Sequence, residues 1–228
     1  MVKAVVLASG GLDSGVTAAI ARRDGAALHF LTIAYGQRHG VEVERARLMG
    51  QALGVADHLV LNVDLRSIGG SSLTADEPVP RGRSERERQA GIPSTYVPAR
   101  NTIFLSLALA YAEKLEAHLI YIGANVLDYS GYPDCRPDYF RAFELTARLG
   151  TRMGREGTAL EVRAPLLNMT KVEIIRTGVE LEVPFHLTHS CYDPSPEGEA
   201  CGHCDSCRIR LEGFRAAGVA DPIRYRKG

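Results

Sequence analysis

Short apolar runs alternate with longer amphipathic stretches along the first half of the chain. Apolar runs at 5–8, 28–34, 59–63 and 119–122 predict buried strands, and helical patterns cover 12–24, 41–53 and 102–115 between them. Strands that alternate with helices predict a parallel sheet with right-handed crossovers and helices on both faces. The expected fold is therefore α/β and Rossmann-like.

The stretch from residue 64 to residue 100 breaks this alternation. It contains a glycine pair, four prolines and a run of charged residues at 81–88, but no periodic pattern. Such a long connection in a compact domain is typical of a solvated mobile segment, a lid or a dimer contact, and these alternatives stay open. We expect an α/β domain over 1–184, with this loop inside it, and a small C-terminal segment over 185–228.

Composition narrows the function classes. The chain has 228 residues, of which 45% are hydrophobic, enough for one α/β domain with a small appendage. Lys and Arg number 27, as do Asp and Glu, so a broad basic surface for nucleic acid is not expected. Neither a signal-peptide pattern nor an apolar run approaching ~18 residues is present, which predicts a cytoplasmic protein without a membrane segment. The apolar helices and the long loop favour a homodimer.

A turn with two glycines joins the first predicted strand to the first helix, and residues 9–14 read SGGLDS. Ligands bind beyond the carboxyl ends of strands in an open α/β sheet, and free N–H groups at a helix N-terminus attract anions. Neither a Walker loop nor a GxGxxG motif is present. We therefore expect another kind of phosphate site here; a tight turn without a ligand is the alternative.

Asp13 and Lys171 are the charged residues expected at this phosphate site. A carboxylate beside phosphate is favourable if Mg2+ lies between them, so Mg2+ is an expected cofactor. Thr170 and Glu173 form a capping-box pattern, which predicts that Lys171 begins a helix. A cation there opposes the helix dipole. A bound anion would resolve that conflict; an exposed, water-screened lysine is the alternative.

Arg100 and Asn101 precede the helical pattern of 102–115. Asn101 is expected to be its N-cap. The planar guanidinium of Arg100 could reach a phosphate or form a surface or interface salt bridge.

Four of the five cysteines lie close together near the C-terminus. Cys201, Cys204 and Cys207 give C-x2-C-x2-C, and Cys191 lies ten positions upstream. Four thiolates suit one tetrahedral, structural zinc ion, which would supply on the order of 10 kcal/mol to this segment. An iron–sulfur cluster is the alternative, although nothing else in the sequence suggests electron transfer. Cys135 is expected to be a buried or pocket-lining thiol.

The segment 123–139 follows the strand predicted at 119–122, so it should lie over the same crevice as the glycine turn. It contains three tyrosines, at 129, 132 and 139, and three aspartates, at 128, 134 and 138. Aromatic faces and carboxylates can stack on a flat heterocycle and accept its N–H groups. An ordinary polar surface loop is the alternative.

Several motifs together resemble a known family. SGGLDS resembles the signature of the PP-loop ATP pyrophosphatases, which cleave ATP between the α and β phosphates. Together with YGQRH at 35–39, YVPARN at 96–101, DYSGYPDCRP at 128–137, SCYDP at 190–194 and the cysteine run, it is similar to the 7-cyano-7-deazaguanine synthases of queuosine biosynthesis. The resemblance covers nearly the whole chain and implies an adenine nucleotide alpha hydrolase-like fold.

The resemblance also implies the reaction and the residues. The reaction is an ATP-dependent ligation that converts 7-carboxy-7-deazaguanine and free ammonia to the 7-cyano compound through adenylated intermediates; free ammonia is expected because the chain has no spare glutaminase domain. Expected catalytic residues are Asp13, Lys171 and Arg100. Expected ATP contacts are Ala8, Ser9, Gly10, Gly11, Leu12, Asp13, Ser14 and Asn101. Expected substrate contacts are Tyr35, Gln37, Arg38, Asn125, Asp128, Tyr129, Tyr132, Asp134 and Arg136.

Two other functions compete with this interpretation. A PP-loop enzyme that adenylates a tRNA base is disfavoured by the balanced charge and by the lack of a basic RNA-binding domain. A non-enzymatic zinc-knuckle binding module, in which the glycine turn is only structural, would turn over no ATP.

Overall fold

The computed structural model describes residues 1–36, 40–75, 83, 91–127 and 132–226. The strands are β1 (Val2–Leu7), β2 (Ala26–Ala34), β3 (Asp57–Asn62), β4 (Leu119–Tyr121) and β5 (Glu161–Arg163). The α-helices are α1 (Leu12–Arg23), α2 (Val41–Leu53), α4 (Arg100–Leu115), α5 (Pro137–Gly150), α6 (Arg152–Arg155), α7 (Lys171–Glu180) and α8 (Asp205–Ala217). Two 3-10 turns, η1 (Pro133–Cys135) and η2 (Phe185–Leu187), complete the described elements.

The strands form one parallel sheet in the order β3-β2-β1-β4-β5. The chain runs outward from β1 to β3 and then returns to the other side of β1 to form β4 and β5. Strand order therefore reverses between β1 and β4. In an open α/β sheet the crevice at such a switch point is the place where ligands bind.

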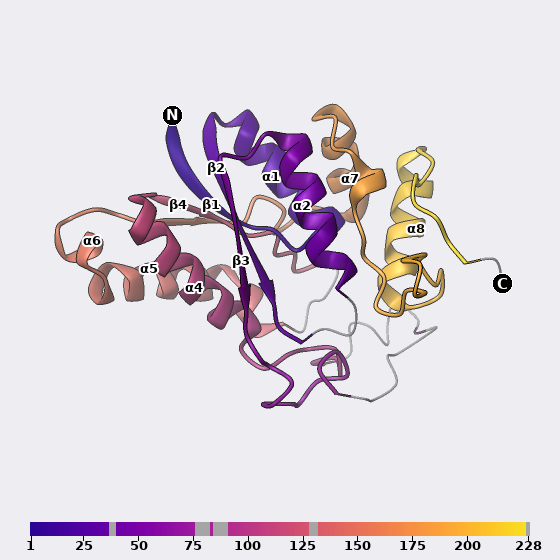
Figure 1. The fold of residues 1–228 in the computed structure, drawn as a ribbon, viewed down its shortest axis with the longest axis horizontal. Helices are drawn as coiled ribbons and strands as arrows, with labels where there is room; N and C mark the ends of the chain where they lie inside the picture. Colours follow the sequence, from indigo (N-terminus) through magenta and orange to yellow (C-terminus); the bar gives the residue numbers. More distant parts are fainter. Residues whose placement is uncertain (37–39, 76–82, 84–90, 128–131, 227–228) are drawn as a thin grey trace.

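Helices cover both faces of the sheet (Figure 1). On one face, α1, α2 and α7 bury a core around Val6, Phe30 and Ile174. On the other, α4 and α5 bury a core around Val5, Leu105 and Phe143. Successive residues such as Val5 and Val6 point to opposite faces, as the pleat of a strand requires. The predicted α/β fold is confirmed.

The C-terminal segment packs beside α7 rather than apart from the sheet domain (Figure 1). Phe214 of α8 meets Phe185 edge to face, with ring centroids 5.2 Å apart. Arg210, also on α8, is 2% exposed and forms a bidentate pair with Asp221 at 2.8 and 2.9 Å. The division at residue 184 stays a prediction, and the two parts share a continuous core.

The ends of the long loop pack on the sheet domain. Leu65 and Val97 are buried in the core on the α4 face, and the N–H of Ser72 donates to the carbonyl of Ser94 at 2.9 Å. Between these ends only Arg83 is described at 76–90, and its guanidinium pairs with Asp205 at 2.7 Å. In the described part of the chain no helix is long and apolar enough to span a membrane.

Candidate active site

A cavity of about 300 Å³ lies at the carboxyl ends of β1, β2 and β4. Its walls come from the glycine turn, the end of β2, the start of α4, the loop after β4 and residues 189–192. The glycine turn and the 123–139 segment were predicted to lie over one crevice. The structure brings both to this cavity.

Tight packing behind the glycine turn requires Gly10. Its φ of +76° lies in the left-handed region, and a Cβ atom there would collide with the carbonyl oxygen of Glu42. The hydroxyl of Ser14 bridges the turn: it donates to the carbonyl of Gly11 at 3.0 Å and accepts the N–H of Ser9 at 3.2 Å. Helix α1 begins after Gly11 without a side-chain cap. Its first turn, which lines the cavity, therefore offers N–H groups to an anion.

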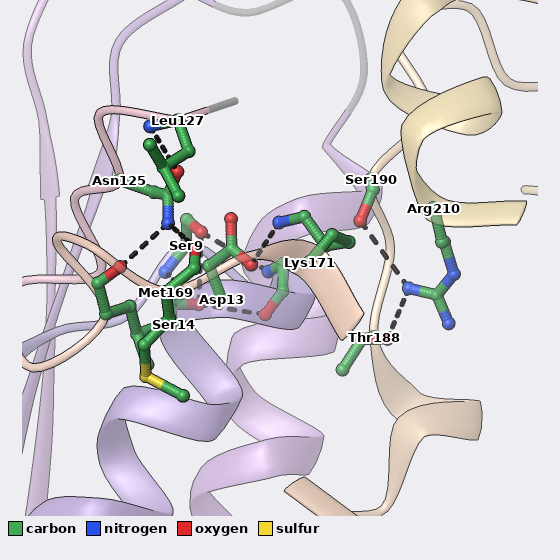
Figure 2. Close-up of polar contacts among 12 residues, drawn as sticks. Ser9, Asp13, Ser14, Asn125, Leu127, Met169, Lys171, Thr188, Ser190 and Arg210 are labelled. Carbon is green, nitrogen blue, oxygen red and sulfur yellow. Dashed lines mark hydrogen bonds and ion pairs between the residues drawn. The ribbon is translucent and has the colours of Figure 1, made fainter. Parts of the chain in front are cut away.

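Asp13 and Lys171 meet at one end of the cavity. The Nζ atom of Lys171 donates to Oδ1 of Asp13 at 2.6 Å, and their side chains are 12% and 31% exposed (Figure 2). The capping box predicted at Thr170 and Glu173 is confirmed, and it makes Lys171 the first residue of α7. Asp13 lines the cavity, whereas Lys171 reaches its edge through Asp13. Contact of either residue with phosphate or Mg2+ stays a prediction.

The start of α4 differs from the sequence prediction. Asn101 was expected to be the N-cap, but Ala99 takes that position, with φ of +51°, and Asn101 lies inside the helix. The carboxylate of Asp134 accepts the N–H of Asn101 at 3.0 Å, so Asp134 caps the helix from another segment. The Asn101 amide donates to the Asp134 carbonyl at 3.3 Å and to Sγ of Cys135 at 3.2 Å.

Aromatic rings and one guanidinium form another part of the cavity wall. Tyr35, Tyr132, Arg100 and Phe104 line the cavity. Burial raises the pKa of Tyr35 and of Tyr132, although the nearby charge of Arg100 opposes the shift in both. Burial also raises the pKa of the Cys135 thiol to about 12. At neutral pH these groups are therefore uncharged, and Arg100 supplies a positive charge to this wall.

Two of the other predicted substrate contacts are used elsewhere. The side chain of Asn125 donates to the carbonyls of Leu166 and Met169, both at 2.7 Å, and accepts the N–H of Leu127 (Figure 2). Although Asn125 lines the cavity, its amide holds the loop after β4 in place. Arg136 is exposed, lies 3.6 Å from Asp138 and does not line the cavity. The predicted contacts Gln37, Arg38, Asp128 and Tyr129 lie outside the described residues.

Sequence reasoning missed several residues of the cavity wall. They include Thr32, Glu42, His189, Tyr192 and Ser206. The N–H of His189 donates to the carbonyl of Gly10 at 2.8 Å, which joins the C-terminal segment to the glycine turn. His189 stands in an irregular segment, so no periodic pattern predicted its place on the cavity wall. Its pKa falls to about 4 because of burial and the nearby charges of Arg45 and Arg210.

The four clustered cysteines converge as predicted. Their Sγ atoms lie within 4.8 Å of one another, and the residues are at most 5% exposed. Backbone N–H groups of Cys201 and Asp193 point at Sγ of Cys191, at 3.2 and 3.3 Å, and that of Cys204 points at Cys201. The thiols of Cys191 and Cys207 lower the pKa of Cys204 by hydrogen bonding. Four converging sulfurs with N–H donors fit a metal ion held by thiolates.

The parallel sheet, the glycine turn at its switch point and the buried cysteine cluster define an α/β protein of the PP-loop nucleotide-binding class. Two solved structures share the fold. NMN synthetase from Francisella tularensis is 16% identical, with a TM-score of 0.50 over 96% of this chain and 78% of that one. A predicted subunit of tRNA methyltransferase from Methanocaldococcus jannaschii is 16% identical, with a TM-score of 0.52 over 100% and 93%. At this identity the likeness concerns the fold alone.

Sequence comparison identifies the family. The model of "Queuosine biosynthesis protein QueC" matches residues 3–218. A 7-cyano-7-deazaguanine synthase from Paramagnetospirillum magneticum is 56% identical over 225 residues, covering 99% of both chains. Another, from Syntrophotalea carbinolica, is 58% identical over 224 residues, covering 98% of this chain and 96% of the relative. The chain belongs to the QueC family, the 7-cyano-7-deazaguanine synthases of queuosine biosynthesis, and is an ATP-dependent ligase.

Proposed function

We propose that the chain converts 7-carboxy-7-deazaguanine, free ammonia and ATP to 7-cyano-7-deazaguanine through two adenylated intermediates. One observation carries the proposal: the uncapped start of α1 lines the same cavity as Arg100, Tyr35 and Tyr132. The helix start is suited to the pyrophosphate part of ATP. The three side chains are suited to an aromatic carboxylate, since the rings can stack on a heterocycle and the guanidinium can pair with an anion.

The proposed reaction has two activation steps. The substrate carboxylate attacks the α phosphate, pyrophosphate leaves and an acyl adenylate forms. Ammonia then displaces AMP and loses a proton, which gives the primary amide. The amide oxygen then attacks the α phosphate of a second ATP, pyrophosphate leaves, and the nitrogen loses one proton, which gives an adenylated imidate. Loss of AMP and of the second nitrogen proton leaves the nitrile.

The residues of the cavity have distinct proposed roles. The N–H groups of the glycine turn bind the leaving pyrophosphate, and the Lys171 ammonium balances charge at the same end of the cavity. Asp13 is suited to Mg2+, which would neutralise phosphate charge when bound. Arg100 orients the substrate carboxylate or the α phosphate. Tyr35 and Tyr132 exclude water from the ring-binding side.

The cysteine cluster is proposed to hold one zinc ion with a structural role. Four thiolates close a tetrahedral shell and leave no position for a reacting water. The chain is further proposed to act as a cytoplasmic homodimer on a small molecule rather than on RNA.

The products of one turnover test the proposed function. Purified protein with 7-carboxy-7-deazaguanine, ATP, Mg2+ and ammonium should release AMP and pyrophosphate, and the 7-cyano compound should appear. ADP with phosphate would contradict the proposal. Omission of ammonium should stop nitrile formation, and glutamine should not replace it.

A substitution at Asp13 tests the site. Asp13→Asn should lower kcat/KM for ATP by about 100-fold or more, because the carboxylate that meets Lys171 and Mg2+ is lost. Asp24→Asn is the matched control, since Asp24 is the C-cap at the other end of α1. Equal activity of the two variants would exclude Asp13 from catalysis.

A further inference from the structure

Helices α7 and α8 pack closely at Gly213. A Cβ atom at this position would lie 2.5 Å from Cγ of Lys171 and 2.9 Å from Cδ1 of Ile175. Heavy atoms that are not bonded do not approach so closely in a packed core. Only a residue without a side chain therefore allows α8 to lie at this distance from α7.

The atoms of Lys171 that face Gly213 belong to the base of its side chain. Cβ of Lys171, which is one bond nearer the backbone than Cγ, would lie 3.3 Å from the added atom. Movement of the distal ammonium alone would not make room for a methyl group here, because Cβ and Cγ lie at the base of the side chain, close to the α7 backbone. The whole side chain would have to turn, and with it the 2.6 Å ion pair between Nζ and Asp13.

Local structure gives no reason for a glycine at this position. Gly213 lies in the interior of α8, where alanine favours a helix more than glycine does. Its φ is not in the left-handed region, in contrast to Gly218 at the end of the helix. The requirement for glycine comes from the contact with α7.

Helix α8 is itself anchored to the segment that borders the glycine turn. Arg210, one turn before Gly213, donates to the hydroxyl of Thr188 at 2.7 Å and lies 3.5 Å from that of Ser190 (Figure 2). Between these two residues, His189 donates its N–H to Gly10. The position of α8 against Lys171 is therefore fixed relative to the turn.

We propose that Gly213 is a positioning residue for Lys171. Because Gly213 has no side chain, α8 can pack against the aliphatic part of Lys171. This contact keeps the Lys171 ammonium on Asp13 at the edge of the nucleotide cavity. The inference rests on the proposed function, because it takes Lys171 to act on ATP.

Gly213→Ala tests the inference, with Gly178→Ala as the matched control. Gly178 also lies in a helix at a tight contact, but its added methyl would meet the apolar side chains of Phe185 and Val16. We expect both variants to be less stable than the wild type, and Gly213→Ala alone to lose about 10- to 100-fold in kcat/KM for ATP. Equal kcat/KM values for the two variants would overturn the proposal.

A double variant separates positioning from packing. Ile175→Val removes the Cδ1 atom that the new methyl would meet, but leaves the contact with Lys171. Gly213→Ala/Ile175→Val should therefore recover thermal stability relative to Gly213→Ala without recovering kcat/KM for ATP. Recovery of both thermal stability and kcat/KM for ATP would show that Gly213 is needed only for helix packing. If Gly213→Ala is too unstable to assay, the double variant carries the comparison.

A measurement without catalysis separates this inference from the proposed function. Lys171 has a side chain only 12% exposed, so we expect its reductive methylation, followed by mass spectrometry, to be slow in the wild type and faster in Gly213→Ala. The exposed Lys114 serves as the internal reference. An unchanged Lys171 rate would overturn the inference, whereas absence of pyrophosphate release by the wild type would overturn only the proposed function.

Discussion

His189 is a buried residue whose protonation the fold opposes. His189 is 4% exposed, and its Nε2 atom has no hydrogen-bond partner among the described residues. Burial first, and then the charges of Arg45 and Arg210, lower its pKa from 6.5 to about 4. The unfolded chain therefore binds a proton below about pH 6.5, whereas the folded protein does so only near pH 4. Stability contributed by the neutral ring is lost as the pH falls through this window.

The variant His189→Gln should be less sensitive to acid. Between pH 6.5 and pH 4 its free energy of unfolding, measured by urea titration at each pH, should fall less than that of the wild type. His118→Gln, at an exposed position, should keep the wild-type pH dependence. If His189→Gln lost as much stability over the same pH interval, the imidazole would not be the group responsible.

Individual site residues were predictable where a local pattern carried the signal. The capping box placed Lys171 at the start of α7, and spacing brought the four cysteines together. The N-cap prediction for Asn101 was wrong because Asp134, 33 positions later, accepts its N–H. A cap supplied from a distant segment leaves no pattern in the neighbouring sequence.

Helix α8 depends on one buried ion pair. Arg210 and Asp221 have side chains that are 2% and 5% exposed, and Tyr225 donates to the same carboxylate at 2.6 Å. Removing one partner of a buried pair leaves the other charge uncompensated. Arg210→Met should therefore lower the free energy of unfolding by about 3–5 kcal/mol.

A second arginine on α8 provides the control. Arg208 lies 3.8 Å from Glu212, and their side chains are 39% and 56% exposed. Arg208→Met should change the free energy of unfolding by about 0.5 kcal/mol or less, because water screens such a pair. Urea unfolding of both variants checks the difference. Similar losses would mean that the buried pair contributes no more than a surface one.

Elements were predictable in proportion to their length and periodicity. The ends of β1, β2, β3 and β4 lie within three residues of the predicted runs. Strand β5 has only three residues, too few to show a pattern. Helix α5 was not predicted, although its buried residues Phe140, Phe143 and Ala147 stand at helical spacing. Its first residues belong to a tyrosine- and aspartate-rich segment that we interpreted as a binding loop.

At the scale of the whole molecule, the cysteine cluster and the cavity share one segment. Cys191 belongs to the cluster of four cysteines that could hold a metal ion, and it also lines the cavity with Tyr192. Ser206, two residues after Cys204, lies on the same wall. Loss of the metal should therefore disturb the nucleotide site as well as the stability of the C-terminal segment.

Cys204→Ser tests this link, with Cys135→Ser as the matched control. Cys135 is also buried but lies outside the cluster. Cys204→Ser should hold less than one zinc per chain, melt at a lower temperature and bind ATP more weakly, because a structural zinc ion contributes on the order of 10 kcal/mol to such segments. Cys135→Ser should keep its zinc. Metal content by atomic spectroscopy, melting temperature and ATP affinity by calorimetry give the three readings.

Together, the melting temperature and the ATP affinity show whether the metal only stabilises the C-terminal segment or also maintains the shape of the cavity. If the metal only stabilises residues 191–207, a chelator will lower the melting temperature and leave ATP affinity unchanged below the transition. If it also shapes the cavity wall, ATP affinity will fall at temperatures where the sheet remains folded. We expect the second result, because the N–H of His189 ties this segment to the carbonyl of Gly10. An unchanged affinity in the metal-free protein would show that the glycine turn keeps its shape without the cluster.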